Sequence, residues 1–207
     1  MRRTAIFIVF FAFLLGTSAV AQPSVSLRGN VGAAFFRSPE GLNTVLNSGV
    51  DLGAGAGLEL YNGLEVVVQG SYDRFTFNGD NYALLEENLS VGTPIEGGAL
   101  NVLNGTIGLR YTLQNQTDAH PYVSGGVGVY RTVLERARVV RTSEVLSRVS
   151  TTRRGYHVAL GSTFSIDEQY SVFFEPRYVV VDTANSELSE NTSIRYLTFR
   201  VGMELQL

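Results

Sequence analysis

The last twelve residues of the chain, YLTFRVGMELQL, alternate strictly between two kinds of side chain. One face of this segment would carry Leu197, Phe199, Val201, Met203, Leu205 and Leu207. The other face would carry polar groups, including Arg200 and Glu204. A period of two predicts a β-strand between two unlike environments. Alone, the pattern fits either a membrane-spanning barrel strand over a polar interior or an exposed edge strand of a soluble sandwich.

The N-terminal segment has the features of a secretory signal peptide. A positively charged start, MRR, is followed by an apolar run over residues 6–15 and by the small-residue motif AVA at residues 19–21. The apolar run is shorter than the about 20 residues that a spanning helix needs. We therefore expect residues 1–21 to be a cleaved, bacterial-type signal peptide and residues 22–207 to form one exported domain.

The composition narrows the class of protein further. The chain has no cysteine, so an exported fold must hold together without disulfides. Its formal net charge of −3 gives no indication of a nucleic-acid partner. A closed barrel needs no disulfide, because every strand is paired and no edge is left.

Alternating segments recur along the whole exported part of the chain. We expect eight strands, at about residues 24–36, 49–61, 64–77, 98–113, 121–138, 150–165, 170–182 and 193–207. Short connections, such as Asn62-Gly63, alternate with four longer ones near residues 37–48, 78–97, 139–149 and 183–192. This rhythm predicts an all-β fold: a single antiparallel eight-stranded transmembrane β-barrel with short periplasmic turns and long extracellular loops.

In its signal sequence, strand number, loop rhythm and final alternating strand, the chain resembles the small eight-stranded outer-membrane β-barrels, such as the OmpA transmembrane domain and OmpX-like barrels. The resemblance implies a place in the bacterial outer membrane and insertion by the barrel-assembly machinery. In that family the machinery reads an aromatic residue at the chain end, where this sequence has Leu207. The resemblance implies no particular role, because barrels of this pattern have different functions.

Aromatic residues near the expected strand ends predict two belts at the membrane interfaces. The periplasmic belt would contain Tyr111, Tyr122, Phe164 and Tyr170. The extracellular belt would contain Phe36, Tyr72, Tyr156, Tyr178 and Tyr196.

The expected register points charged side chains of both signs into the barrel. They are Asp51, Glu59, Glu65, Asp73, Arg110, Glu175, Arg177, Arg200 and Glu204. Such charges should form ion pairs, because an unpaired buried charge costs several kcal/mol. We expect a plug of salt bridges, with an ion path or gate as the alternative. Pro176 cannot donate a ladder hydrogen bond, so it predicts a bulge or a locally open bond in its strand.

The chain is poor in catalytic and metal-binding residues. It has only two histidines, His120 and His157, and no cysteine, so we expect no metal, no cofactor and no catalytic centre. In the lipid A deacylases of similar architecture, a serine follows the histidine by two positions on the same face. Here that position is Ala159, and we expect His157 to be a lumen residue near the extracellular rim.

Arginines are concentrated in the third long hairpin. They are Arg131, Arg136, Arg138, Arg141, Arg148, Arg153 and Arg154. Because arginine binds phosphate bidentately, the phosphates of lipopolysaccharide are the candidate partner. A solvated polar hairpin, balanced locally by Glu135 and Glu144, is the alternative.

The sequence therefore favours a non-enzymatic outer-membrane barrel with a structural or surface-interaction role. That role would be envelope integrity, lipopolysaccharide binding or the presentation of loops to a partner. Three alternatives stay open. They are an accessory barrel of a secretion or surface-assembly system with a protein partner, a lipid A-modifying enzyme, and a soluble lipocalin-like barrel whose apolar faces point inward.

Overall fold

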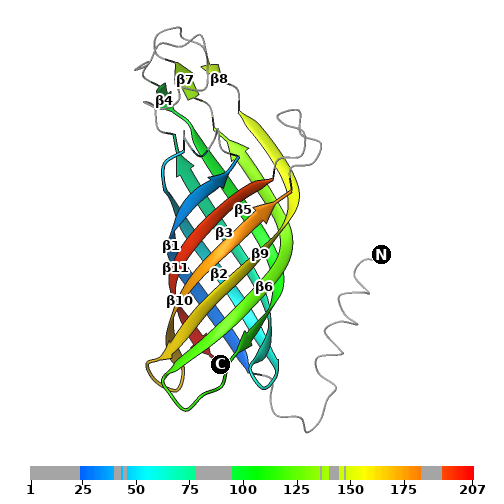
Figure 1. The fold of residues 1–207 in the computed structure, drawn as a ribbon, viewed down its shortest axis with the longest axis vertical. Helices are drawn as coiled ribbons and strands as arrows, with labels where there is room; N and C mark the ends of the chain where they lie inside the picture. Colours follow the sequence, from blue (N-terminus) through cyan, green and yellow to red (C-terminus); the bar gives the residue numbers. More distant parts are fainter. Residues whose placement is uncertain are drawn as a thin grey trace, which may run out of the picture.

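The chain forms a closed antiparallel β-barrel, seen in the computed structural model in Figure 1. The structure describes residues 24–39, 43, 46–77, 95–135, 137–139, 145–146, 148–182 and 193–207. The barrel strands are β1 (Val25–Ser38), β2 (Gly49–Tyr61), β3 (Leu64–Thr76), β5 (Ala99–Thr112), β6 (Ala119–Leu134), β9 (Val149–Ser165), β10 (Tyr170–Val181) and β11 (Ile194–Gln206). Neighbouring strands follow the order β1-β11-β10-β9-β6-β5-β3-β2, which confirms the expected eight-stranded fold.

The two ends of the barrel differ. The short connections of residues 62–63, 113–118 and 166–169 lie at one end, together with the C-terminus (Figure 1). We call this the turn end. At the opposite end, β4 (Ile95–Gly97), β7 (Ala137–Val139) and β8 (Val145–Leu146) form a separate small sheet. We call this the sheet end. Among the described residues, no helix is long and apolar enough to cross a membrane.

The strand positions agree closely with the alternation in the sequence. The main difference concerns the strand expected at residues 121–138. β6 begins at Ala119 and ends at Leu134, and residues 137–139 leave the barrel to form β7. The signal peptide of residues 1–21 and most of the four long connections fall outside the described residues, so those expectations stay predictions.

The strands are strongly staggered around the barrel. The stagger is measured by following paired residues from strand to strand around the barrel, starting and ending on β1. This path runs through Ala34, Thr198, Arg177, Ala159, Ser124, Arg110, Glu65, Glu59 and Ser24. The path returns to β1 after 34 − 24 = 10 residues, which is the shear of the barrel. Eight strands enclose an interior only wide enough for side chains to fill. The stagger therefore decides which inward side chains meet.

The apolar faces of the strands point outward. Val31 is 60% exposed, Val127 is 62% exposed and Leu160 is 66% exposed, although each lies in the middle of its strand. The alternate positions point inward and carry most of the buried polar groups. This orientation contradicts the lipocalin-like alternative, in which the apolar faces would line the interior.

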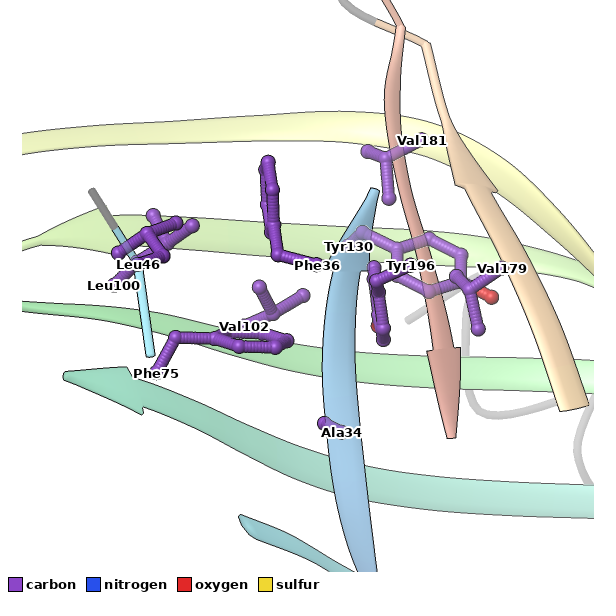
Figure 2. Close-up of a cluster of buried hydrophobic side chains, with 10 residues drawn as sticks. All are labelled: Ala34, Phe36, Leu46, Phe75, Leu100, Val102, Tyr130, Val179, Val181 and Tyr196. Carbon is purple, nitrogen blue, oxygen red and sulfur yellow. The ribbon is translucent and has the colours of Figure 1, made fainter. Parts of the chain in front are cut away.

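An apolar cluster closes the lumen at the sheet end (Figure 2). It consists of Ala34, Phe36, Leu46, Phe75, Leu100, Val102, Tyr130, Val179, Val181 and Tyr196. We call this cluster the apolar cap. The rings of Phe36 and Tyr196 both pack edge-on against Phe75, with centroids 5.6 Å apart in each pair. The sequence did not predict this cap.

The cap corrects the expected aromatic belts. The sequence pattern predicts Phe36 and Tyr196 in the extracellular belt, but they are 4% and 0% exposed inside the barrel. Tyr122 is likewise inside, at 3% exposed. Tyr111, Tyr156, Phe164 and Tyr170 are exposed on the outer wall, as expected. An aromatic residue near a strand end can face the lumen or the outer wall. Which of the two it faces depends on whether it occupies an inward or an outward position in the alternation of the strand.

Candidate functional site

The charged lumen residues form two ion-pair clusters below the apolar cap. The cluster nearer the turn end contains two arginines and two glutamates. Arg28 donates to Glu204 at 2.8 Å, and Arg110 binds the same carboxylate through both terminal nitrogens, at 2.6 and 2.8 Å. Arg110 also pairs with Glu65. Because the four side chains carry equal positive and negative charge, the cluster is formally neutral.

Aromatic rings pack around this first cluster. The guanidinium of Arg28 lies 4.5 Å from the ring centre of Phe173, and that of Arg110 lies 5.4 Å from the ring centre of Tyr122. Cation–π contacts of this kind are favourable where water is excluded. The hydroxyl of Tyr122 donates to Glu175 at 3.0 Å, which links the first cluster to the second.

The second cluster lies at mid-height in the barrel and is also formally neutral. Arg200 pairs with Asp51 at 2.6 Å, and Arg177 pairs with Glu175 at 2.7 Å. All four side chains are at most 4% exposed. Asn30 donates to Asp51 at 2.6 Å, which occupies that carboxylate's second oxygen.

Seven of the nine sequence-predicted lumen charges take part in these ion pairs, and two do not. Asp73 is fully buried but accepts from the hydroxyl of Tyr196 at 2.8 Å instead. Glu59 is half-buried at the turn end, where its carboxylate accepts from the backbone N–H of Gly63 at 2.9 Å. It belongs to the turn rather than to a lumen pair.

Sequence reasoning missed Arg28, which joins the first cluster. The signal was present, because Ser26, Arg28 and Asn30 share one face of a segment that alternates with Leu27, Gly29 and Val31. The ladder at Pro176 has the open form that was expected and no bulge. β10 pairs with β11 without a shift, but the β9 partners of Glu175 and Pro176 are missing from an otherwise continuous register.

His157 lies deeper than expected. It sits at the middle of β9, is 6% exposed and lines a cavity of about 10 Å³ with Arg28 and Arg177. It is therefore not near the rim. In the part of the chain that the structure describes, no group of histidine, cysteine, aspartate or glutamate side chains could hold a metal ion.

The arginines of the third long hairpin divide between different surfaces. Arg131, Arg148 and Arg154 are exposed, whereas Arg153 is half-buried at an inward position beside Tyr130. Only the backbone of Arg138 is described, in β7. Arg136 and Arg141 lie outside the described residues.

The outer wall carries a second arginine pattern that the sequence analysis did not single out. On five strands, the outward position two residues beyond the apolar band is an arginine, and on β6 one further apolar residue, Val133, lies beyond that arginine. The five steps are Phe35 to Arg37, Tyr72 to Arg74, Val129 to Arg131, Tyr156 to Arg154 and Leu197 to Arg195. All five lie toward the sheet end. We call these five residues the arginine girdle.

Among the described residues, the girdle has no counterpart at the opposite end. The described arginines nearest the turn end, Arg28 and Arg110, both point into the lumen and are ion-paired there. The outer surface at the turn end instead exposes Tyr61, Leu113, Ile166 and Leu207. The barrel wall is therefore an apolar band with arginine along one edge only.

Comparisons with known proteins agree with this architecture. Neisserial surface protein A matches with a TM-score of 0.55 and 15% identity, covering 92% of this chain and all of that one. Ail of Yersinia pestis, solved with the heparin analogue sucrose octasulfate, matches with a TM-score of 0.52 and 13% identity over 90% of this chain and all of that one. The N-terminal β-barrel domain of Pseudomonas aeruginosa OprF matches with a TM-score of 0.51 and 10% identity, again over 90% of this chain and all of that one.

The chain thus has the fold of the small outer-membrane β-barrels. No protein-family model and no curated protein matches its sequence. The similar structures also include a protease, OmpT of Escherichia coli, with a TM-score of 0.50 and 12% identity over 94% of this chain and all of that one. The fold is therefore shared by proteins with and without enzymatic activity, and the role of this chain must be argued from its own residues.

Proposed function

We propose that the chain is an integral outer-membrane β-barrel with a structural and surface-interaction role, and that it binds lipopolysaccharide phosphates through the arginine girdle. The observation that carries this proposal is that arginines border the apolar band of the outer wall along one edge and, among the described residues, not along the other. Apolar side chains cover the middle of the barrel, and arginines follow them toward the sheet end on five strands.

The chemistry of the girdle fits an anionic lipid layer. An outward apolar band is stable only against lipid, because exposing it to water loses the hydrophobic stabilisation. Arginine binds phosphate through paired, charge-assisted hydrogen bonds. A ring of such groups along one edge matches a leaflet with phosphates at that level, and in the proposed orientation the turn end faces the periplasm.

Two further observations support a binding role. Ail has the same fold and was solved with the heparin analogue sucrose octasulfate, so an anionic ligand on such a barrel has a precedent. In the lumen, two neutral ion-pair clusters and the apolar cap obstruct the described interior above a cavity of about 210 Å³ at the turn end. The obstructed lumen favours a role on the outer surface over transport.

The geometry does not favour the enzymatic alternative. An enzyme acting on lipid A needs a nucleophile or base that reaches the outer leaflet. Of the two histidines, His157 is buried in the lumen, and His120 lines a cavity at the turn end. For an accessory barrel of a secretion or assembly system, the described residues supply no specific support.

The proposal is tested on whole cells and on the purified protein. We expect the mature chain in the outer-membrane fraction, soluble only with detergent and with heat-modifiable gel mobility. We also expect the refolded protein to bind lipopolysaccharide more tightly than the same lipopolysaccharide after removal of its phosphates. Equal affinity for the two forms would contradict the phosphate role. Identical lipid A mass spectra with and without the protein are expected if the barrel is not an enzyme.

A further inference from the structure

A groove on the outer wall lies where the apolar band meets the arginine girdle. Its volume is about 770 Å³, within the range of roughly 300–1,000 Å³ typical of small-molecule sites. Leu103 of β5 and Val133 of β6 supply its apolar lining, and Leu103 is 54% exposed. Four residues further along the same face of β5, Ile107 is also 54% exposed, so the apolar lining continues into the band.

One wall of the groove is polar and internally satisfied. Asn101 is only 7% exposed although it lies on the outer face of β5. Its side-chain oxygen accepts from the hydroxyl of Tyr72 at 2.7 Å, and its amide nitrogen donates to Glu135 at 2.8 Å. Glu135 also forms an ion pair with Arg74 at 3.2 Å. The one acidic group of the groove is therefore already neutralised.

Two cations of the groove remain without an acidic partner. Arg131 uses its Nε to donate to the hydroxyl of Ser150 at 3.3 Å, which fixes the side chain and leaves its terminal nitrogens for another acceptor. Arg148 is exposed just before β9 begins. Within the described ranges, neither arginine forms an ion pair. The groove thus combines two available guanidinium groups with an apolar floor.

We propose that this groove is a defined binding site for one phosphorylated, acylated sugar lipid of the outer leaflet. A phosphate of the headgroup binds Arg131 and Arg148, and an acyl chain lies over Leu103 toward Ile107 and the band. The proposal rests on the membrane location proposed above and deepens it. According to this proposal, one girdle residue, Arg131, belongs to a defined binding site and does more than add to the general positive charge of the edge.

The opposite wall of the barrel offers a matched control. Arg37 and Arg195 belong to the same girdle, on β1 and β11, which stand across the barrel from β6 and β5 in the strand order. Arg195 is also held by a serine, since its Nε donates to the hydroxyl of Ser193 at 2.8 Å. The described cavities with an arginine in their lining include neither residue. Removing this pair changes the net charge equally but leaves the groove intact.

The experiment compares two double variants of the full mature protein, refolded in detergent micelles. They are Arg131→Gln/Arg148→Gln for the groove and Arg37→Gln/Arg195→Gln for the control. Native mass spectrometry measures binding of bisphosphorylated lipid A, of dephosphorylated lipid A and of inorganic phosphate alone. Heat-modifiable gel mobility reports whether each variant has folded. Should the groove variant not fold, Arg148→Gln alone replaces it, because that residue lies outside the barrel ladders.

We expect the groove variant to bind bisphosphorylated lipid A about tenfold more weakly than wild type, while the control loses no more than about threefold. We expect neither dephosphorylated lipid A nor inorganic phosphate to bind wild type with comparable affinity. Equal losses in the two variants would overturn the groove but leave the girdle and the proposed function standing. Strong binding of inorganic phosphate alone would assign the site to free anions and overturn the lipid. Absence of any lipid A binding by wild type would instead contradict the proposed function itself.

Discussion

Single residues of the lumen show how a narrow barrel tolerates full charges in its interior. Arg200 is 1% exposed, and its contacts are distributed over Asp51, Ser71 and Glu175. Removing a buried charge from water costs several kcal/mol, and only partners at good geometry offset that cost. Removing a lumen arginine should therefore destabilise the barrel mainly because it leaves a buried carboxylate without a partner.

We predict that Arg200→Met destabilises the barrel by about 3–5 kcal/mol, because the carboxylate of Asp51 stays buried without its partner. The second substitution in Arg200→Met/Asp51→Asn removes that charge and should recover part of the loss. Urea unfolding of the refolded protein in micelles measures both effects. The exposed Arg195→Met is the control, with an expected change of about 0.5 kcal/mol or less. A similar unfolding midpoint for Arg200→Met and Arg195→Met would rule this account out.

A second residue-scale prediction concerns Gly202, which provides space for a neighbouring ring. A Cβ atom on Gly202 would overlap the backbone oxygen of Gly29 and the ring of Phe173. We expect Gly202→Ala to cost about 1–3 kcal/mol in the same unfolding assay, as overpacking does elsewhere. At Gly105, on the outer face, a Cβ would meet nothing within 4 Å. Gly105→Ala should be neutral or slightly stabilising, and an equal loss at both positions would show that ring packing is not the cause.

At the scale of the strands, β10 combines a continuous ladder with an interrupted one. Pro176 pairs in register with Phe199 of β11, but the ladder to β9 is open at residues 175 and 176 of β10. Proline has no N–H to donate, so the missing bond belongs to the side that its nitrogen faces. That side is therefore β9.

We predict that Pro176→Val closes the β9–β10 ladder without changing the β10–β11 register. The new N–H would add one hydrogen bond, worth about 0.5–1.5 kcal/mol, and should raise the urea midpoint. Hydrogen exchange provides the local measurement, with slower exchange expected for amides of β9 near Leu160. Faster exchange in β11 would mean that the substitution shifted the other ladder and would contradict the prediction.

The strands themselves could be predicted from the sequence, whereas their partners across the lumen could not. Alternation located each strand because lipid and lumen impose opposite requirements on successive residues. The pairing of Arg110 with Glu204 joins β5 to β11, which are not neighbours in the barrel. Such a contact depends on the shear, which no single segment encodes. The apolar cap was missed for another reason: Phe36 and Tyr196 were assigned by depth along the strand rather than by parity.

At the scale of the whole molecule, the barrel is polar inside at the turn end and apolar inside at the sheet end. The two ion-pair clusters lie in the middle of the lumen and in its part nearer the turn end. Phe36, Phe75 and Tyr196 close the sheet end. An ion crossing this interior would have to separate buried pairs and then pass an apolar constriction. Both steps are unfavourable, because each leaves charge without water or a partner.

We therefore predict that the refolded protein gives no unitary current steps in a planar lipid bilayer, with a general porin as the positive control. Phe36→Ala/Phe75→Ala removes two of the four rings of the cap, and we expect this variant to stay silent as well. The neutral clusters around Glu204 and Arg200 would still fill the lumen below the opened cap. Ion-selective steps in wild type would restore the alternative of an ion path through the charged residues. Steps seen only in the double variant would show that the cap, and not the ion pairs, closes the barrel.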